Sequence, residues 1–169
     1  AESGSVYIHA AAFYLFALYQ VAQPDRAYQV LRQMLPGDDA ADYLQRGQLP
    51  VYIPNYYRGA WQQLPRTAGR SSQLFNTGTV HWVYRCLIEG LFGVKGCPQG
   101  LQFNPQLPSH WSGVALERAF RGAHFSINIR RQADLTAAQL IVNGETQADM
   151  LFSNIMPGQR YQVNVLLPA

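Results

Sequence analysis

The sequence from Ser71 to Gly93 reads SSQLFNTGTVHWVYRCLIEGLFG, and the rest of the chain is organised around it. Its first half is a polar loop of small residues that ends at Thr77, Gly78 and Thr79, and its second half is apolar on almost every side. The second half is therefore predicted to be a buried helix. A Thr-Gly-Thr turn at a helix start offers backbone N–H groups that can bind a phosphate or another oxyanion. An ordinary threonine N-cap that contacts only water is the alternative left open by the local sequence.

The composition predicts a folded protein with a substantial core. The 169 residues are 48% hydrophobic and 12% aromatic, and only 14% are charged. Except for Lys95, the 13 basic residues are arginines, and they are scattered along the chain. Nucleic-acid-binding proteins have basic runs instead, whereas scattered arginines suit the recognition of carboxylate or phosphate. Cys86 and Cys97 fit neither a metal knuckle nor a disulfide framework, so we expect no metal site and two thiols in a reducing compartment.

Two helices are predicted near the start of the chain. Val6 to Ala22 is an apolar stretch without the pattern of a signal peptide, and it is marginal in length for a membrane span. A helix buried inside a larger helical domain is the interpretation that we favour. Pro24 is well placed in the first turn of a second, amphipathic helix, which ends before Pro36-Gly37.

The next segment, GQLPVYIPNYYRGAWQQLPRTAGR, has neither helical nor alternating periodicity. Long irregular segments inside a compact domain are often functional. Aromatic rings could stack here on a sugar, and arginines could donate hydrogen bonds to it. The candidates for contact with an acceptor sugar are Tyr56, Tyr57, Arg58 and Arg70. A loop whose aromatic residues only cover the helix ends beneath it is the alternative, and the sequence leaves both open.

After Gly93 the pattern changes to alternation with a period of two, which is typical of strands. The clearest runs are HFSINIRR, QLIVNGET and RYQVNVLLP. Asn143-Gly144 is a strong signal for a hairpin turn. We interpret the region as an antiparallel β-sandwich. Since the helices precede the strands and do not alternate with them, the sequence predicts two layers or domains, not a parallel α/β sheet.

The order of four motifs resembles a known family. The motifs are TGTVHWVYR, GLFGVKG, GLQFNPQLPSHWSG and ERAFRGAHFSINIRR. They are similar to the C-terminal part of the inverting disaccharide phosphorylases, the cellobiose and chitobiose phosphorylase family (glycoside hydrolase family 94). That family has a Thr-Gly-Thr turn before an aromatic-rich helix, a Pro-x-x-Pro-x-x-Trp stretch and an Arg-x-Phe-Arg-Gly-Ala strand. PVYIPNYYRGAW and RTAGRSSQLFNTGT resemble the branch that acts on cellobionic acid, whereas Val80-His81 departs from the small residues usual in the family.

The resemblance implies an α+β fold: closing helices of an (α/α)6 barrel over residues 1–100, then a jelly-roll-like antiparallel β-sandwich over residues 101–169. It also implies phosphorolysis of a β-glucosidic disaccharide, with inversion, to give α-glucose 1-phosphate. Phosphate attacks the anomeric carbon while an Asp protonates the leaving oxygen. No acidic residue of this chain matches that Asp, so no catalytic residue is assigned here. We expect the proton donor upstream and the chain by itself to be inactive.

The resemblance further implies that His9, Thr77 and Gly78 bind phosphate, together with an upstream Arg. His9 matches by its place in SVYIHAAAF, at the start of an apolar helix. A lone histidine on such a helix is usually a core residue. A phosphate dianion, however, needs donors of this kind, namely an imidazole, a hydroxyl and N–H groups at a helix start.

The expected partners follow from the same resemblance. Inorganic phosphate is the co-substrate, and no cofactor or metal is expected. The chain would meet an oligosaccharide or sugar-acid substrate and the rest of its own polypeptide, in the cytoplasm and without nucleic acid or membrane, and a homodimer is one arrangement considered. A non-catalytic carbohydrate-binding or structural module, or the phosphorylase-like module of a cyclic β-1,2-glucan synthase, is the alternative function.

Overall fold

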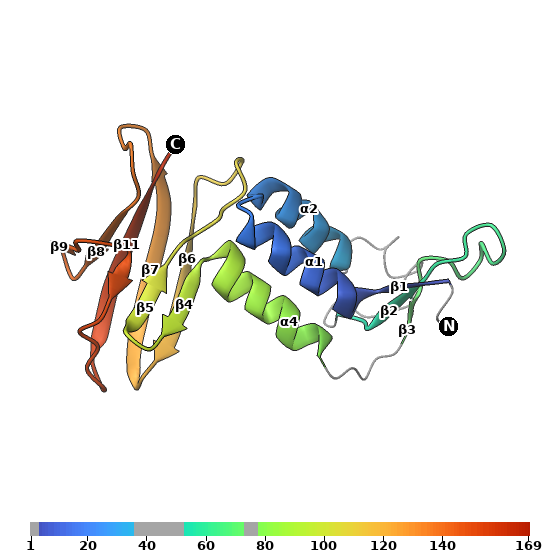
Figure 1. Cartoon of the computed structure of the whole chain (residues 1–169), viewed down its shortest axis with the longest axis horizontal. Coiled ribbons are helices and arrows are strands. Elements are labelled where there is room, and N and C mark those ends of the chain that lie inside the picture. The colour runs from blue at the N-terminus through green and yellow to red at the C-terminus, as the bar shows by residue number, and fades with distance from the viewer. Residues whose placement is uncertain (1–3, 36–52, 73–77) are drawn as a thin grey trace. The chain divides into compact units, whose positions relative to one another are not determined.

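The computed structural model describes residues 4–35, 53–72 and 78–169. The chain forms two compact units, Ala1–Cys86 and Leu87–Ala169. The first unit holds helices and a small sheet, and the second holds two larger sheets (Figure 1). Helices therefore precede the main sheets, as the sequence predicts. The assignment of residues 1–100 to an (α/α)6 barrel stays a prediction.

Three helices build the first unit: α1 (Ile8–Gln20), α2 (Pro24–Met34) and α4 (Thr79–Arg85). Helix α1 packs against both α2 and α4 (Figure 1). Pro24 begins α2, and the buried residues of this helix share one face, which confirms the predicted amphipathic helix. They are Ala27, Leu31 and Met34.

Helix α1 is buried along one side. The buried side chains are Ile8, Ala12, Leu15, Leu18 and Tyr19. Phe13 and Tyr14 lie on the other side and are 48% and 45% exposed. With 13 residues, α1 is the longest described helix, and no helix in the described ranges has the length and apolar character needed to cross a membrane.

The quoted stretch forms α4 and continues as a wider helical turn, Cys86–Leu91, in which the N–H of Phe92 bonds the carbonyl of Leu87 at 2.9 Å. The expectation that this helix is buried on almost every side is wrong for the described residues. Val80 is 45% exposed and Tyr84 is 64% exposed. The reason is that α4 makes its main contacts with a single described element, α1, so its opposite face lies uncovered.

A small antiparallel sheet lies within the first unit and consists of β1 (Ser5–Tyr7), β2 (Tyr56–Arg58) and β3 (Ser71–Ser72), in that order. From the sequence, Val6 and Tyr7 are expected in the first helix, and the residues of β2 and β3 are expected to be irregular. Each strand has only two or three residues. A period of two cannot be recognised over such a length.

The second unit contains two sheets. One has the order β10-β5-β4 and the other the order β6-β7-β11-β8-β9. Their bounds are β4 (Val94–Cys97), β5 (Gly100–Phe103), β6 (Gly113–Phe120), β7 (Ala123–Gln132), β8 (Gln139–Val142), β9 (Glu145–Thr146), β10 (Leu151–Phe152) and β11 (Arg160–Pro168). Phe125 and Tyr161 of the larger sheet stack at 5.0 Å, and Phe152 of the smaller sheet meets Tyr161 edge-on at 5.0 Å. The two sheets thus share one core, as in a β-sandwich.

The larger sheet is not purely antiparallel, which corrects the prediction. Strands β7 and β11 pair in parallel, with Phe125 opposite Tyr161 and Ile127 opposite Val163. Parallel neighbours need a long crossover, and the segment that contains β8, β9 and β10 supplies it. Alternation predicts which residues face the core but is the same for both strand directions, so it could not reveal this pairing.

Two hairpin turns use left-handed backbone. The predicted turn at Asn143-Gly144 is confirmed, with φ of 50° and 88° between β8 and β9. Arg121 and Gly122, with φ of 50° and 76°, form a second such turn between β6 and β7. The Arg-x-Phe-Arg-Gly-Ala motif is therefore a hairpin and not the single strand expected from the resemblance.

Candidate functional site

The imidazole of His9 stands at the start of α1, in a cluster of aromatic rings. Tyr7 directly precedes the helix, and its hydroxyl lies 3.1 Å from Nδ1 of His9. The ring of Phe13, one turn further along α1, is 5.0 Å away, centroid to centroid. Nε2 of His9 is buried and has no hydrogen-bond partner among the described residues. A buried polar atom in this state is costly unless a ligand or water completes it.

Gly78 lies directly against this imidazole. A Cβ atom added at residue 78 would lie 2.5 Å from Cε1 and 2.7 Å from Nε2 of His9. Glycine is therefore needed here for the close approach of the ring. The structure brings together two of the three predicted phosphate-binding residues, His9 and Gly78. The third, Thr77, lies outside the described residues.

Asn55 accepts hydrogen bonds from the first residues of both α1 and α4. Its side-chain Oδ1 accepts a hydrogen bond from the hydroxyl of Thr79 at 2.7 Å, and its backbone carbonyl accepts one from the N–H of Ile8 at 2.9 Å. Thr79 is fully buried, and its hydroxyl faces Asn55, while α4 has Gly78 as its N-cap, without a side-chain cap. Asn55 is not among the residues singled out from the sequence; Pro54 and Asn55 are both residue types that favour turns, which was the available cue.

Three of the four acceptor-sugar candidates gather near this cluster. Tyr56 stacks on Tyr7, with ring centroids 4.7 Å apart and planes 15° apart. Arg58 follows Tyr56 by two residues in β2, so both lie on the same face of the strand. The N–H of Arg58 bonds the carbonyl of Arg70 at 2.8 Å, and the N–H of Gly69 bonds the carbonyl of Arg58 at 2.7 Å. The two arginines are thus neighbours through backbone hydrogen bonding, and both are exposed.

Tyr57, the fourth candidate, does not join them. It is 7% exposed, and its hydroxyl donates to the carbonyl of Met34 at 3.1 Å. Alternation along β2 turns it away from Tyr56 and Arg58, toward the helices. Tyr57 thus packs against the helical layer. This is the role that the alternative interpretation, a loop that only covers the helix ends, gives to the aromatic residues of this segment.

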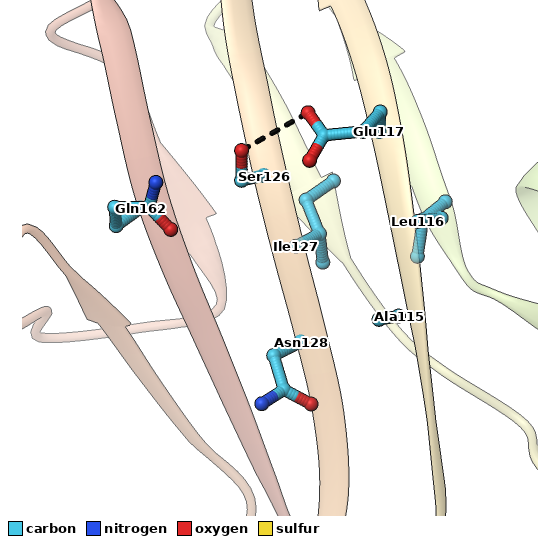
Figure 2. Close-up of a pocket in the computed structure, with 7 residues that line it drawn as sticks. All are labelled: Ala115, Leu116, Glu117, Ser126, Ile127, Asn128 and Gln162. Carbon is cyan, nitrogen blue, oxygen red and sulfur yellow. Dashed lines mark hydrogen bonds between the residues drawn. The ribbon is translucent and has the colours of Figure 1, made fainter.

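The second unit has a pocket lined by one acidic side chain. Figure 2 shows a shallow hollow on the larger sheet, where Glu117 accepts a hydrogen bond from Ser126 at 3.0 Å, with Asn128 and Gln162 nearby. A single carboxylate bonded to a hydroxyl does not make an acid–base pair. Within the described ranges, no group of three or more His, Cys, Asp or Glu side chains is placed to hold a metal ion.

Comparisons with known proteins find relatives of the chain. Residues 97–145 match the model of the glycosyl hydrolase family 65 C-terminal domain. Over 169 residues the chain is 53% identical to a cellobionic acid phosphorylase of Neurospora crassa, covering 99% of the chain and 21% of that protein. It is 31% identical over 169 residues to a 3-O-beta-D-glucopyranosyl-beta-D-glucuronide phosphorylase of Paenibacillus borealis, covering 98% and 22% respectively. The chain belongs to the disaccharide phosphorylase family that its motifs resemble.

A more distant relative carries another function. The cyclic beta-(1,2)-glucan synthase NdvB of Rhizobium meliloti is 28% identical over 137 residues, which are 78% of the chain and 5% of that protein. The chain spans about a fifth of the length of the curated phosphorylases that it matches, at 21% and 22%. The activities that the names of these phosphorylases state are those of proteins much longer than this chain.

Proposed function

We propose that the chain is the C-terminal part of an inverting phosphorylase that uses inorganic phosphate to cleave a β-glucosidic disaccharide and releases α-glucose 1-phosphate. The observation that carries the proposal is the buried Nε2 of His9, without a described partner and directly against Gly78. Such an atom, at the start of a helix, has hydrogen-bonding capacity left for an anion.

The proposed phosphate site consists of His9, Thr77 and Gly78. The imidazole would donate from Nε2, the threonine from its hydroxyl and the turn from its backbone N–H groups. A phosphate in this place is partly shielded from water, which strengthens charge-assisted hydrogen bonds. An Arg from the preceding part of the polypeptide would supply the remaining positive charge.

We propose cellobionic acid as the disaccharide. The exposed pair of arginines, Arg58 and Arg70, offers planar donors that match a carboxylate, and their mutual repulsion would be relieved by an anion between them. Tyr56, on the same face, offers a ring on which a sugar could stack. The two phosphorylases compared above support an acidic sugar, because the name of each includes one: cellobionic acid and a glucuronide.

The proton donor is proposed to lie in the rest of the polypeptide, which would complete an (α/α)6 barrel. The described contacts of His9 are with Tyr7, Phe13 and Gly78, and no acidic side chain is among them. The chain alone is therefore expected to be inactive. Location in the cytoplasm, a homodimer and the absence of a cofactor remain predictions from the resemblance.

The alternative functions are weaker but testable. A module of a cyclic β-1,2-glucan synthase has support in the match to NdvB, at 28% identity over 78% of the chain, against 53% over 99% for the phosphorylase. A non-catalytic carbohydrate-binding module would use the half-buried Tyr56 and the exposed arginines without phosphate. Both alternatives predict that the protein does not cleave the disaccharide with phosphate.

The test uses the full-length protein with cellobionic acid and inorganic phosphate, and it measures α-glucose 1-phosphate. We expect product from the wild type. In His9→Ala, KM for phosphate should rise by roughly ten- to hundredfold, because one charge-assisted hydrogen bond of about 1.5–3 kcal/mol is lost. His81→Ala, an exposed histidine on α4, is the matched control and should behave as the wild type. No phosphate-dependent product from the folded wild type would reject the proposal.

A further inference from the structure

The two ring nitrogens of His9 have different surroundings, and the proposed function leaves open which of them carries the proton. Nδ1 lies 3.1 Å from the hydroxyl of Tyr7, whereas Nε2 is buried beside Gly78. A neutral imidazole has one proton on one of the two nitrogens. The group at Nδ1 therefore determines whether Nε2 presents an N–H or a lone pair to a ligand.

We propose that Tyr7 is a positioning residue that donates its phenolic proton to Nδ1 and so keeps the proton of the neutral His9 imidazole on Nε2. This inference rests on the proposed function, since it names the residue that makes His9 a donor to phosphate. With the opposite assignment, Nδ1 would donate to Tyr7 and the lone pair of Nε2 would face the phosphate oxygens, which repel it.

The chemistry of the partner supports this assignment. Buried histidines commonly donate from Nδ1 to a backbone carbonyl or a carboxylate, both of which only accept. The described partner of Nδ1 is instead a phenol, which can donate. Within the described part of the chain, the other rings around His9 are Phe13 of its own helix and, beyond Tyr7, Tyr56 of β2, and neither carries a carboxylate.

Two ring contacts orient the side chain of Tyr7, which is 41% exposed. Its ring stacks on Tyr56 at 4.7 Å and meets the His9 ring edge-on at 5.7 Å and 76°. The two tyrosines are opposite each other in the pairing of β1 and β2. Tyr7→Phe keeps both ring contacts and removes only the hydroxyl, so it separates the hydrogen bond from the packing.

The first experiment observes the tautomer directly. In full-length protein labelled with 15N at histidine, the chemical shifts of the two ring nitrogens distinguish N–H from a lone pair, and His9→Ala identifies the His9 signals. We expect Nε2–H in the wild type and a mixture with Nδ1–H in Tyr7→Phe. Tyr14→Phe, a half-exposed tyrosine on α1 with Arg26 over its ring, is the control. Nδ1–H in the wild type, or an unchanged Nε2–H in Tyr7→Phe, would overturn the proposal.

The second experiment links the tautomer to phosphate. In Tyr7→Phe, KM for phosphate should rise about three- to tenfold, the contribution of one neutral hydrogen bond, while KM for the disaccharide at saturating phosphate stays the same. In a His9→Ala background the same change should have no further effect on phosphate. Equal changes in both KM values would mean that the hydroxyl only supports the fold, which overturns the proposal. A shifted tautomer with unchanged KM for phosphate would show that His9 does not donate to phosphate, which overturns the proposal, whereas phosphate-dependent product from the wild type would still support phosphorolysis.

Discussion

Gly78→Ala is the sharpest perturbation of the candidate site. The new Cβ would lie 2.5 Å from Cε1 and 2.7 Å from Nε2 of His9. Carbon atoms pack best at about 3.5–4.0 Å, so the imidazole would have to move by about 1 Å. The backbone itself accepts alanine, since φ is −122° and ψ is −21° at residue 78. The ring is held between Phe13 and Tyr7, so we expect the strain to lower the free energy of unfolding by about 1–3 kcal/mol.

The effect on activity should exceed the effect on stability. Displacement of a binding group by about 1 Å can cost about a hundredfold in rate, and the added methyl group also occupies space beside Nε2. The assay is phosphorolysis at varied phosphate in the full-length protein, with thermal unfolding of the same samples. Gly4→Ala is the control, since a Cβ there would meet its nearest neighbour, the Cβ of Ala60, at 3.4 Å.

A double-mutant cycle with His9→Ala isolates the clash. In the absence of the imidazole, Gly78→Ala should change stability by less than about 0.5 kcal/mol, because the atoms that collide are gone. If Gly78→Ala instead leaves the phosphate dependence and the melting temperature of the wild type intact, His9 does not lie against Gly78 and the reasoning on this site is refuted.

Three further predictions concern other parts of the chain. Arg131 donates to three backbone carbonyls at 3.0–3.1 Å, so Arg131→Lys, which keeps the charge but loses the fork of donors, should lower the free energy of unfolding by about 2–4 kcal/mol in urea titrations; no change would show that these bonds are dispensable. Gly93 has φ of 62°, and a Cβ there would lie 2.0 Å from a backbone carbonyl, so Gly93→Ala should cost about 3 kcal/mol or more and reduce the yield of soluble protein. Arg58→Gln combined with Arg70→Gln should raise KM for cellobionic acid about tenfold or more and leave KM for neutral cellobiose unchanged; equal effects on both sugars would contradict a carboxylate site.

Sequence patterns predicted the sandwich faces well because alternation reports burial directly. Alternation in HFSINIRR puts Phe125, Ile127 and Ile129 on one face of a strand, and all three are buried in the core. The Asn143-Gly144 turn could also be predicted from the sequence, since its positive φ angles favour these residue types. Strand direction is a property of the whole chain path, so the parallel pairing of β7 with β11 was beyond any local pattern.

The candidate site could be predicted only in part from the sequence, because its residues come together from distant parts of the chain. His9 and Gly78 were chosen from the family resemblance, because nothing in their local sequences shows that the two lie together. Asn55 matters through two hydrogen bonds to residues far away in the sequence. Tyr57 was misplaced among the sugar contacts because one residue of shift along β2 reverses the direction of a side chain.

The place of β11 in the larger sheet constrains how this unit can fold. Strands β7 and β8 follow each other in the chain, yet β11 lies between them. The sheet cannot grow by successive hairpins: the position between β7 and β8 has to stay open until residues 160–168 insert. Contacts over such sequence separations slow folding, and during that time the open edges of β7 and β8 can pair with other chains. Expression temperature and the folding rate of β11, more than final stability, should therefore decide the yield of this unit.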